Sequence, residues 1–391
     1  MTDFYPSDRY GYSSLLSAGE LTVLGRLRTV LEKQVQPLLA EYWEAGNFPR
    51  RIHQPLVDLD LMAAPEITNA EGRTSGLYTG FRTFELARTD ASVATYYNAQ
   101  AGLFRTTVLR GGSPEQAVEL DPRIRRFEYT GVFALTEPEH GSDIARGMAT
   151  TARRDGGDWV LNGAKRWIGG ADAADVLAVF ARDEADGQVK AFLVPRESEG
   201  VRITKIRGKT SLRIMQNANI ALAGVRVPDS ARLARINSFK DVAALMRPLR
   251  ADVAWIATGL QAGAYEASLR YTRERTQFGR HIADFQLTQQ KLATMLANVT
   301  ASLGMVVRLA QRQEEGIFTD EDSALAKMFT CSAMRSTVAL ARETAGGNGI
   351  VLENDVARFH ADAEAVYSYE GTHDINALIV GRALSGTAAF V

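Results

Sequence analysis

The sequence has few of the features that mark specialised classes of protein. Its 391 residues include a single cysteine, Cys331, so no disulfide can form within the chain and we expect a reducing compartment. The 45 Lys+Arg and 46 Asp+Glu leave a net charge of −1, without the basic excess that favours nucleic-acid binding. No stretch reaches the ~18 uninterrupted apolar residues of a membrane span, and the N-terminus has no signal-peptide pattern. We therefore expect a soluble cytoplasmic protein with no nucleic-acid or membrane partner.

Metal-binding and nucleophilic motifs are also missing. The five histidines never fall at the spacing of a metal-binding pair, so we expect no metal site. Gly208-Lys209-Thr210 resembles the end of a phosphate-binding loop, but Ile203 stands where that loop needs its first glycine. No serine lies in a Gly-x-Ser-x-Gly elbow, which argues against that class of hydrolase.

The composition that remains is globular. Hydrophobic residues make up 46% of the chain and charged residues 23%, which excludes disorder and collagen-like repeats. With roughly 150 residues per domain as a guide, the length predicts two or three domains with a sizeable buried core.

The first third of the chain has the pattern of helices. From Leu15 to about Ala45 apolar residues recur at intervals of three and four, and Ser17 with Glu20 forms a plausible capping box. Further helical patterns cover residues 78–88, 94–109 and 114–120.

Short runs rich in Val, Ile and Phe follow, separated by turn signals and without helices between them. This pattern predicts an antiparallel β domain. The expected strands are 131–135, 159–162, 176–180, 191–194, 201–206 and 220–227.

Helical periodicity returns after Asp241 and predicts a bundle of long antiparallel helices. The first of these helices, 250–273, is rich in Ala and Gly, which lets a neighbouring helix approach closely. Helix 285–315 follows, then helix 323–344, with a capping pattern at 319–322 and the pair Gly346-Gly347 after its end. We therefore expect three domains, at 1–130, 131–235 and 236–391.

Three short segments stand out as candidate binding or catalytic sites. The polar loop 136–143 can hold a heterocycle or a phosphate, although a plain turn is the alternative. Trp167 beside Gly169-Gly170 lets another ring approach the backbone, or it is a core tryptophan next to a β-bulge. Glu370, between tyrosine and glycine, suits proton abstraction, or it is a charge at a helix N-terminus.

Five longer motifs together resemble the acyl-CoA dehydrogenase family over most of the chain. They are FALTEPEHGSD at 133–143, KRWIGG at 165–170, RERTQFGRHIADFQ at 273–286, ETAGGNGI at 343–350 and YEGTHDINALIVGRALSG at 369–386. The last is most similar to glutaryl-CoA dehydrogenases, whereas RWIGG resembles short-chain acyl-CoA oxidases. The resemblance implies an α+β, mainly α fold with an N-terminal helical domain, a middle antiparallel β-barrel-like domain and a C-terminal four-helix bundle.

The resemblance also implies one FAD per subunit of a homotetramer. One group of FAD-binding residues would be Phe133, Leu135, Thr136, Ser142, Trp167, Ile168, Gly169, Thr372 and Asp374. A second group would be Arg275, Gln277, Phe278, Gln286, Glu343, Gly346 and Gly347, in which Arg275, Gln286 and the 343–347 stretch hold the FAD of a neighbouring subunit. Exposed N–H groups and an arginine suit a pyrophosphate, which replaces the simpler interpretation of the glycine pair as a helix end.

In this family Glu370 would remove the α-proton of an acyl-CoA while the β-hydrogen leaves as hydride to the flavin, giving the 2-enoyl-CoA. The substrate-binding residues implied are Ser142, Asn98, Arg250, Tyr369 and Gly371. Electrons would pass to an electron-transfer flavoprotein, in fatty acid or amino acid catabolism.

Two departures from the family pattern bear on substrate and acceptor. Ala87, Ala94 and Asn98 stand where glutaryl-CoA dehydrogenases bind a distal carboxylate, and no cation lies between Arg88 and Arg105. We therefore expect a short or branched monocarboxylic acyl group rather than glutaryl.

Gly169 replaces a threonine that contacts the flavin in most members, which could leave space for dioxygen. The alternatives are thus a short-chain acyl-CoA oxidase, other flavin chemistry such as monooxygenation or decarboxylation, and a scaffold without activity.

Overall fold

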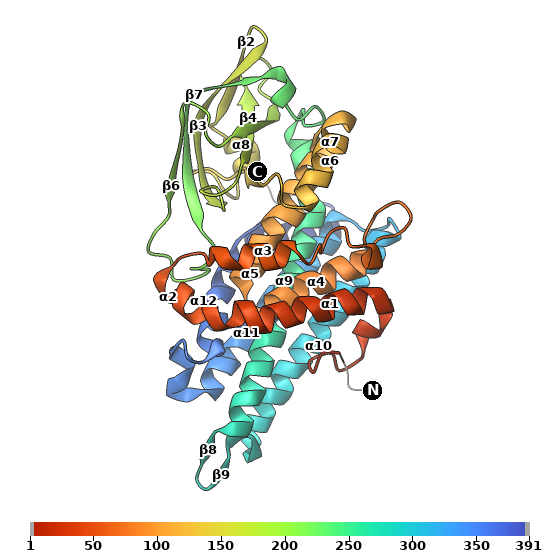
Figure 1. Cartoon of the computed structure of the whole chain (residues 1–391), viewed down its shortest axis with the longest axis vertical. Coiled ribbons are helices and arrows are strands. Elements are labelled where there is room, and N and C mark those ends of the chain that lie inside the picture. Colours follow the sequence, from red (N-terminus) through yellow and green to blue (C-terminus); the bar gives the residue numbers. More distant parts are fainter. Residues whose placement is uncertain (1–3, 388–391) are drawn as a thin grey trace. The chain divides into compact units, whose positions relative to one another are not determined.

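The computed structural model describes residues 4–387, which form two compact units. The first unit contains the residues up to Thr95, the segment Thr210–Ile214 and the residues from Arg250 onward. The second contains Tyr96–Lys209 and Met215–Leu249. The ribbon in Figure 1 is coloured along the sequence, so both units can be followed there.

The first unit begins with helices that confirm the predicted periodicity. The Ser17 capping box is present, since Ser17 Oγ accepts from Glu20 N at 3.2 Å and Glu20 Oε2 accepts from Ser17 N at 2.8 Å. The single helix expected up to Ala45 is interrupted near Pro37, which has no N–H to donate. The α-helices are α1 (Ala18–Val30), α2 (Leu39–Ala45), α3 (His53–Val57) and α4 (Gly76–Thr89). The π and 3-10 turns are Tyr12–Leu15, Leu31–Val35, Gln36–Leu38, Arg50–Ile52 and Pro65–Ile67.

The C-terminal helices of this unit are long and pack on one another. The capping box at Thr319 and Asp322 that begins α11 is present. The elements are α9 (Phe239–Glu274), the hairpin β8 (Thr276–Gln277) and β9 (Arg280–His281), α10 (Gln286–Glu314), α11 (Asp320–Thr344), α12 (Asp355–Ser368) and α13 (His373–Ser385), with 3-10 turns Ile282–Asp284 and Gly346–Ile350. α9 belongs to this unit from Arg250 onward.

The small residues of α9 have the expected packing role. A Cβ added at Gly259 would overlap the carbonyl of Phe84, and one at Gly263 would overlap the carbonyl of Arg88. Both carbonyls belong to α4, so the glycines let the two helices approach closely.

Among the described helices, only α10 is long and apolar enough to cross a membrane. This is weak evidence, because the core helix of a soluble protein passes the same test.

The second unit combines a few helices with a seven-stranded sheet. Its helices are the end of α5 (Ala91–Asn98), a π-helical turn Ala99–Phe104, α6 (Arg105–Gly111), α7 (Pro114–Arg125) and α8 (Ile144–Gly147), with a 3-10 turn Asp229–Ala231. The strands are β1 (Gly131–Ala134), β2 (Thr151–Asp155), β3 (Asp158–Gly169), β4 (Val176–Asp183), β5 (Val189–Pro195), β6 (Val201–Lys205) and β7 (Asn217–Pro228).

The sheet differs from the wholly antiparallel prediction in two pairings. Its strand order is β1-β4-β2-β3-β7-β6, with β5 also paired to β4. β4 runs parallel to both β1 and β2, whereas the other pairs are antiparallel. β1 and β2 are not joined to β4 by hairpins, because other strands lie between them along the chain, so each can run in the same direction as β4.

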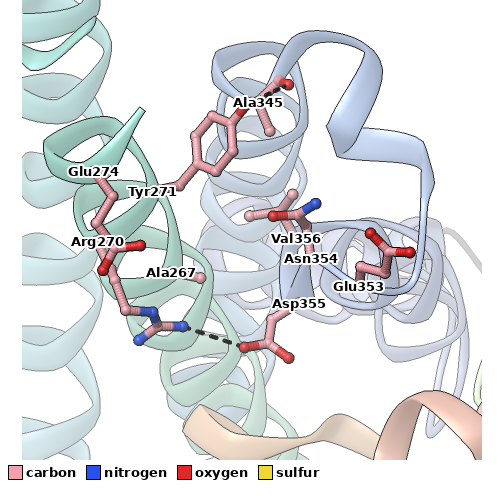
Figure 2. A pocket seen from close by; sticks show the side chains of 9 residues that line it. All are labelled: Ala267, Arg270, Tyr271, Glu274, Ala345, Glu353, Asn354, Asp355 and Val356. Atoms are coloured by element: carbon pink, nitrogen blue, oxygen red, sulfur yellow. Dashed lines mark hydrogen bonds and ion pairs between the residues drawn. The ribbon is translucent and has the colours of Figure 1, made fainter. Parts of the chain in front are cut away.

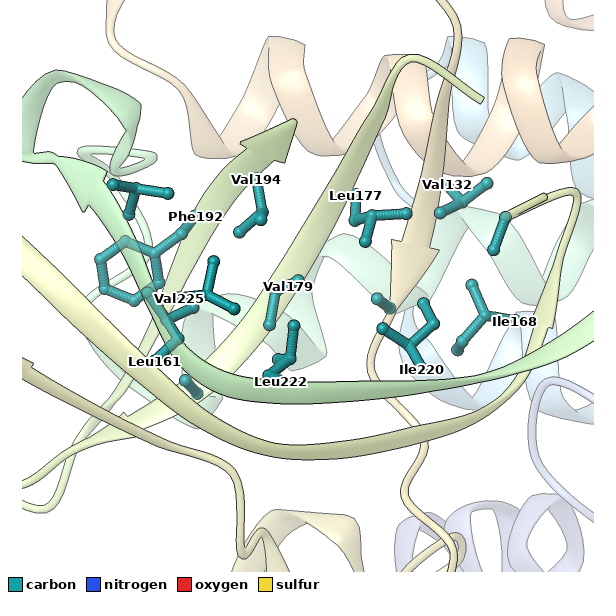
Figure 3. Packing of buried hydrophobic residues seen from close by; sticks show 14 of the residues in the cluster. Val132, Leu161, Ile168, Leu177, Val179, Phe192, Val194, Ile220, Leu222 and Val225 are labelled. Carbon is teal, nitrogen blue, oxygen red and sulfur yellow. The ribbon is translucent and has the colours of Figure 1, made fainter. Parts of the chain in front are cut away.

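β4 is buried on both faces and explains the continuous apolar run in the sequence. Leu177 and Val179 point into one core, shown in Figure 3, and Val176 and Phe180 point into another on the opposite face. The labelled members of the first core are Val132, Leu161, Ile168, Leu177, Val179, Phe192, Val194, Ile220, Leu222 and Val225.

Candidate active site

A buried ion pair holds the polar loop 136–143 that follows β1. Lys165 Nζ lies 2.8 Å from Glu137 Oε1 and also donates to the carbonyl of Leu135 at 3.0 Å. The Glu137 carboxylate accepts two more hydrogen bonds, from Ala149 N at 2.7 Å and Thr150 N at 3.0 Å. Burial lowers the pKa of Lys165 to about 8, although Glu137 opposes this shift. These two residues therefore fix the loop and are not free to bind a ligand.

The predicted flavin residues near this loop differ in what they can offer. Leu135 and Ile168 are buried in the two cores, so only their backbone atoms can face a ligand. Phe133 is half-buried, with its ring centroid 4.7 Å from that of Phe180. Thr136 is half-buried and Ser142 is exposed, so both hydroxyls remain accessible.

Trp167 lies at a β-bulge near the end of β3. The register between β3 and β7 shifts between Lys165 and Ile168, and Trp167 has a φ of 65°. Its side chain is 52% exposed, so the alternative of a core tryptophan is wrong although the bulge is present. The guanidinium of Arg166 lies over the indole, 4.8 Å from its centroid, and the exposed part of the ring is available for stacking.

The space beside the neighbouring Gly169 is not empty, although the lack of a side chain at this position suggested that it would be. A Cβ added there would overlap the Cε methyl of Met215, whose side chain is 1% exposed. Met215 therefore occupies the volume that a larger residue at 169 would need.

Glu370 lies between α12 and α13 in an environment that disfavours its charge. It is half-buried and has a φ of 53°, an uncommon conformation for a residue with a side chain. Its Oε2 is buried, and no partner for it lies among the described residues. Burial and the nearby Asp252 raise the pKa of Glu370 to about 8, although Lys327 and Arg250 act in the opposite direction. The surroundings of Glu370 therefore make its carboxylate a stronger base than a carboxylate in water.

The residues around Glu370 are held by hydrogen bonds. Tyr369 Oη lies 3.3 Å from Thr95 Oγ1, and burial raises the pKa of this phenol well above its ordinary value. Gly371 has a φ of 94°, and its carbonyl accepts from Asn376 Nδ2 at 2.9 Å. Thr372 caps α13 by accepting from Ile375 N at 3.3 Å.

This capping arrangement bears on the alternative role suggested for Glu370. Because Thr372 is the N-cap, Asp374 lies in the first turn of α13 and Glu370 precedes the cap. The acidic charge within the helix N-terminus is therefore that of Asp374. Thr372 and Asp374 are both exposed.

Two predicted substrate residues lie in different units. Arg250 lies near Gly371, because a Cβ added to that glycine would be 4.0 Å from Arg250 Nε. Arg250 Nη1 is 3.9 Å from Asp320 Oδ1. Asn98 is buried in the second unit, whereas Glu370, Tyr369, Gly371 and Arg250 belong to the first.

The second group of predicted cofactor residues is exposed and lies at the β8–β9 hairpin, at the start of α10, at the end of α11 and in the turn after it. Phe278 is 94% exposed, and with Gly279 it has positive φ, the conformation of a type I′ hairpin turn. Glu343 pairs with Lys291 at 2.7 Å. Arg275, Gln277, Gln286, Gly346 and Gly347 are likewise exposed. Their exposed donors can hold a ligand presented from outside this unit.

A small cavity lies close to this turn but contains none of the predicted site residues. Its volume is about 190 Å³, and Figure 2 shows Arg270 of α9 pointing toward Asp355 of α12, with 3.3 Å between their charged atoms. Tyr271 Oη donates to the carbonyl of Ala345 at 3.3 Å. The lining residues are Ala267, Arg270, Tyr271, Glu274, Ala345, Glu353, Asn354, Asp355 and Val356.

Family models match most of the chain. The N-terminal, middle and C-terminal domains of acyl-CoA dehydrogenase match residues 19–128, 132–225 and 239–385. The chain belongs to the acyl-CoA dehydrogenase family. Its fold is that of the family, with a β half-barrel between two helical domains, and it is an FAD-dependent oxidoreductase.

Relatives share about a third of its sequence over nearly the whole length. The 3-(aryl)acrylate reductase of Clostridium sporogenes is 30% identical, and the match covers 91% of this chain and 96% of the relative. The glutaryl-CoA dehydrogenase of Desulfococcus multivorans is 30% identical over 92% and 95% of the two chains. The structure of a Mycobacterium smegmatis glutaryl-CoA dehydrogenase in complex with FADH2 superposes with a TM-score of 0.92, at 29% identity and 99% and 100% coverage.

Proposed function

We propose that this acyl-CoA dehydrogenase introduces a Cα–Cβ double bond into a short or branched monocarboxylic acyl-CoA, with Glu370 as the base that removes the α-proton. The observation that carries the proposal is the buried, unpartnered Oε2 of Glu370. A buried carboxylate with an oxygen that lacks a hydrogen-bond donor is a stronger base than one in water, and its raised pKa brings it closer to that of an activated α-carbon.

FAD supplies the acceptor for the β-hydride when it is bound. The residues that fit it in the second unit are the exposed Trp167, the hydroxyls of Thr136 and Ser142, and the backbone of Leu135, Ile168 and Gly169. In the first unit, Thr372 and Asp374 lie exposed at the N-terminus of α13, where their hydroxyl and carboxylate oxygens can accept hydrogen bonds from the cofactor. The exposed hairpin and glycine turn supply the second set of donors, which supports FAD sharing between subunits of a homotetramer.

The ion pairs of two arginines support a substrate without a distal carboxylate. Arg88 is paired with Glu85 at 2.7 Å and with Glu266 at 2.6 Å. Arg105 is paired with Asp121 at 2.5 Å. The two cations that flank the cation-free stretch are therefore already neutralised. A buried distal carboxylate would have to break one of these pairs, which is costly.

The filled space at Gly169 favours an electron-transfer flavoprotein over dioxygen as the acceptor. An oxidase needs dioxygen to reach the reduced cofactor, and the Cε methyl of Met215 occupies the space beside Gly169. The reverse reaction, reduction of an enoyl group as the name of the C. sporogenes relative describes, would use the same base as a proton donor.

The test is anaerobic titration of the holoenzyme with butyryl-, isovaleryl- and glutaryl-CoA. The bleaching of the flavin absorbance is the measured signal. We expect bleaching by the monocarboxylic thioesters and little by glutaryl-CoA. Glu370→Gln should retain FAD and lose the bleaching, while the control Glu364→Gln, an exposed carboxylate of α12, should behave as wild type. Bleaching of Glu370→Gln at the wild-type rate would refute the assigned base.

Admission of air after this reduction tests the acceptor. We expect slow reoxidation by air and fast reoxidation by an electron-transfer flavoprotein. Fast production of hydrogen peroxide would instead establish the oxidase.

A further inference from the structure

Lys327 is a buried cation that the reaction as described does not use. It lies on α11, its side chain is 1% exposed, and within residues 4–387 no carboxylate forms an ion pair with it. Its Nζ instead donates hydrogen bonds to two backbone carbonyls, those of Tyr369 and Gly371. These two carbonyls belong to the residues immediately before and after Glu370.

The backbone that Lys327 holds is in an unfavourable conformation. Glu370 has a φ of 53° and Gly371 a φ of 94°. A non-glycine residue keeps a positive φ only where surrounding contacts enforce it. Asn376 Nδ2 adds hydrogen bonds to the carbonyls of Gly371 and Thr372, each at 2.9 Å. The carbonyl of Gly371 therefore has two donors, and Lys327 is the one that bridges both sides of Glu370.

We propose that Lys327 is a positioning residue for Glu370, which holds the left-handed turn that aims the carboxylate and places a positive charge beside it. This inference rests on the proposed role of Glu370 as the base. An apolar side chain of equal length would fill the same volume without the cost of burying an ammonium group, so packing alone does not account for a lysine here.

The charged groups around Glu370 come from two helices. α9 contributes Arg250 and Asp252, and α11 contributes Lys327, with Cys331 one turn further along and close to it. Asp252 raises the pKa of Glu370, whereas Lys327 and Arg250 lower it. Removal of the charge at 327 therefore leaves Arg250 as the remaining cation, and the pKa of Glu370 should rise.

The experiment compares the holoenzymes of wild type, Lys327→Met, Lys327→Arg and a matched control, Thr330→Val. The control removes another buried polar group of α11. Within the described part of the chain its hydroxyl donates to two carbonyls of the same helix, Ala326 O at 2.8 Å and Lys327 O at 3.4 Å. FAD content and thermal unfolding establish that each variant is folded. The rate of flavin reduction by butyryl-CoA is then measured from pH 6 to pH 10.

We expect Lys327→Met to reduce flavin about 100-fold more slowly, because a small misplacement of a base has an effect of this size. The rising limb of its pH profile should move to higher pH, and the dissociation constant for butyryl-CoA should change little. Lys327→Arg keeps the charge and should keep the position of that limb. A wild-type rate and pH profile in Lys327→Met would overturn the proposal.

Hydrogen–deuterium exchange of residues 367–376 provides a test that does not depend on turnover. We expect about tenfold faster exchange of this segment in Lys327→Met and no change in Thr330→Val. If wild type is not reduced by any acyl-CoA, the proposed function fails but this measurement still decides whether Lys327 holds the turn. Unchanged exchange in Lys327→Met would show that it does not.

Discussion

The raised pKa of Glu370 predicts that this carboxyl group lowers the stability of the folded protein at neutral and alkaline pH. The side chain has an ordinary pKa of 4.5, and burial together with Asp252 raises it to about 8 in the folded state. Between these two values the folded protein binds this proton and the unfolded chain releases it. Stability therefore falls as pH rises through this window, because the folded state must then give up a proton that it prefers to keep. Glu370→Gln has no proton to lose and should escape this effect.

The size of the effect follows from the pKa difference. One pKa unit corresponds to about 1.4 kcal/mol, so the shift from 4.5 to about 8 amounts to on the order of 4–5 kcal/mol above pH 8. At pH 6 the same shift gives about 2 kcal/mol, and at pH 4 it gives almost nothing. We therefore expect Glu370→Gln to be more stable than wild type by an amount that grows with pH.

The assay is urea unfolding of both proteins with saturating FAD between pH 4 and pH 9. Tryptophan fluorescence monitors the unfolding. Glu364→Gln serves as the control, because it removes an exposed carboxylate near the end of α12 without touching the site. Parallel stability curves for wild type and Glu370→Gln across the whole range would refute the reasoning. So would a difference that grows toward low pH.

Three further predictions concern the rest of the site and its support. Gly169→Thr should destabilise the protein by about 1–3 kcal/mol in urea unfolding, because its side chain would overlap Met215, and Met215→Ala in the same background should restore most of the loss. Lys165→Met should lower the free energy of unfolding in urea by about 3–5 kcal/mol, since it leaves the Glu137 carboxylate buried without its cation. The loss should be smaller in the double variant Lys165→Met/Glu137→Leu. Burial and Asp90 raise the pKa of Asp362 from 3.8 to about 7, so Asp362→Asn should gain thermal stability over wild type as pH rises through that window and show only a small gain at pH 4.

The local pattern of the sequence predicted most of the elements, because periodicity and capping are local properties. The capping boxes at Ser17 and Thr319 and the long helices are present, and six of the strands overlap the expected runs. β2 was missed because its sequence, Thr-Ala-Arg-Arg-Asp, is polar, and it forms through pairing with β3 rather than through its own burial. The parallel pairing of β4 was also missed. The pairing and direction of strands that are distant in sequence depend on the whole sheet, so the local sequence does not reveal them.

The site was only partly predictable for a similar reason. Motifs placed Glu370 and Trp167, and the structure shows the unusual backbone of each. Lys327 was missed, although a signal existed. It lies in an apolar helical stretch one turn before Cys331, on the face that is buried, where a charged residue needs a specific partner. The partners are main-chain carbonyls 42 and 44 residues away, and no side-chain pattern reveals them.

The surroundings of Glu370 affect both the stability of the folded protein and the basicity of this carboxylate. The proposed base needs a raised pKa, and the burial of Glu370 with an unpartnered Oε2 provides it. It also needs a fixed direction, which the left-handed backbone of Glu370 provides. Both conditions destabilise the folded state. The groups that offset them all act on the backbone: Lys327 and Asn376 bind the flanking carbonyls, and Thr372 fixes the start of α13. None of these hydrogen bonds reaches the Glu370 carboxylate, so they fix its geometry without satisfying its oxygens. The charge of Lys327 lowers the pKa of Glu370, but burial raises it by more, so the pKa stays above its ordinary value.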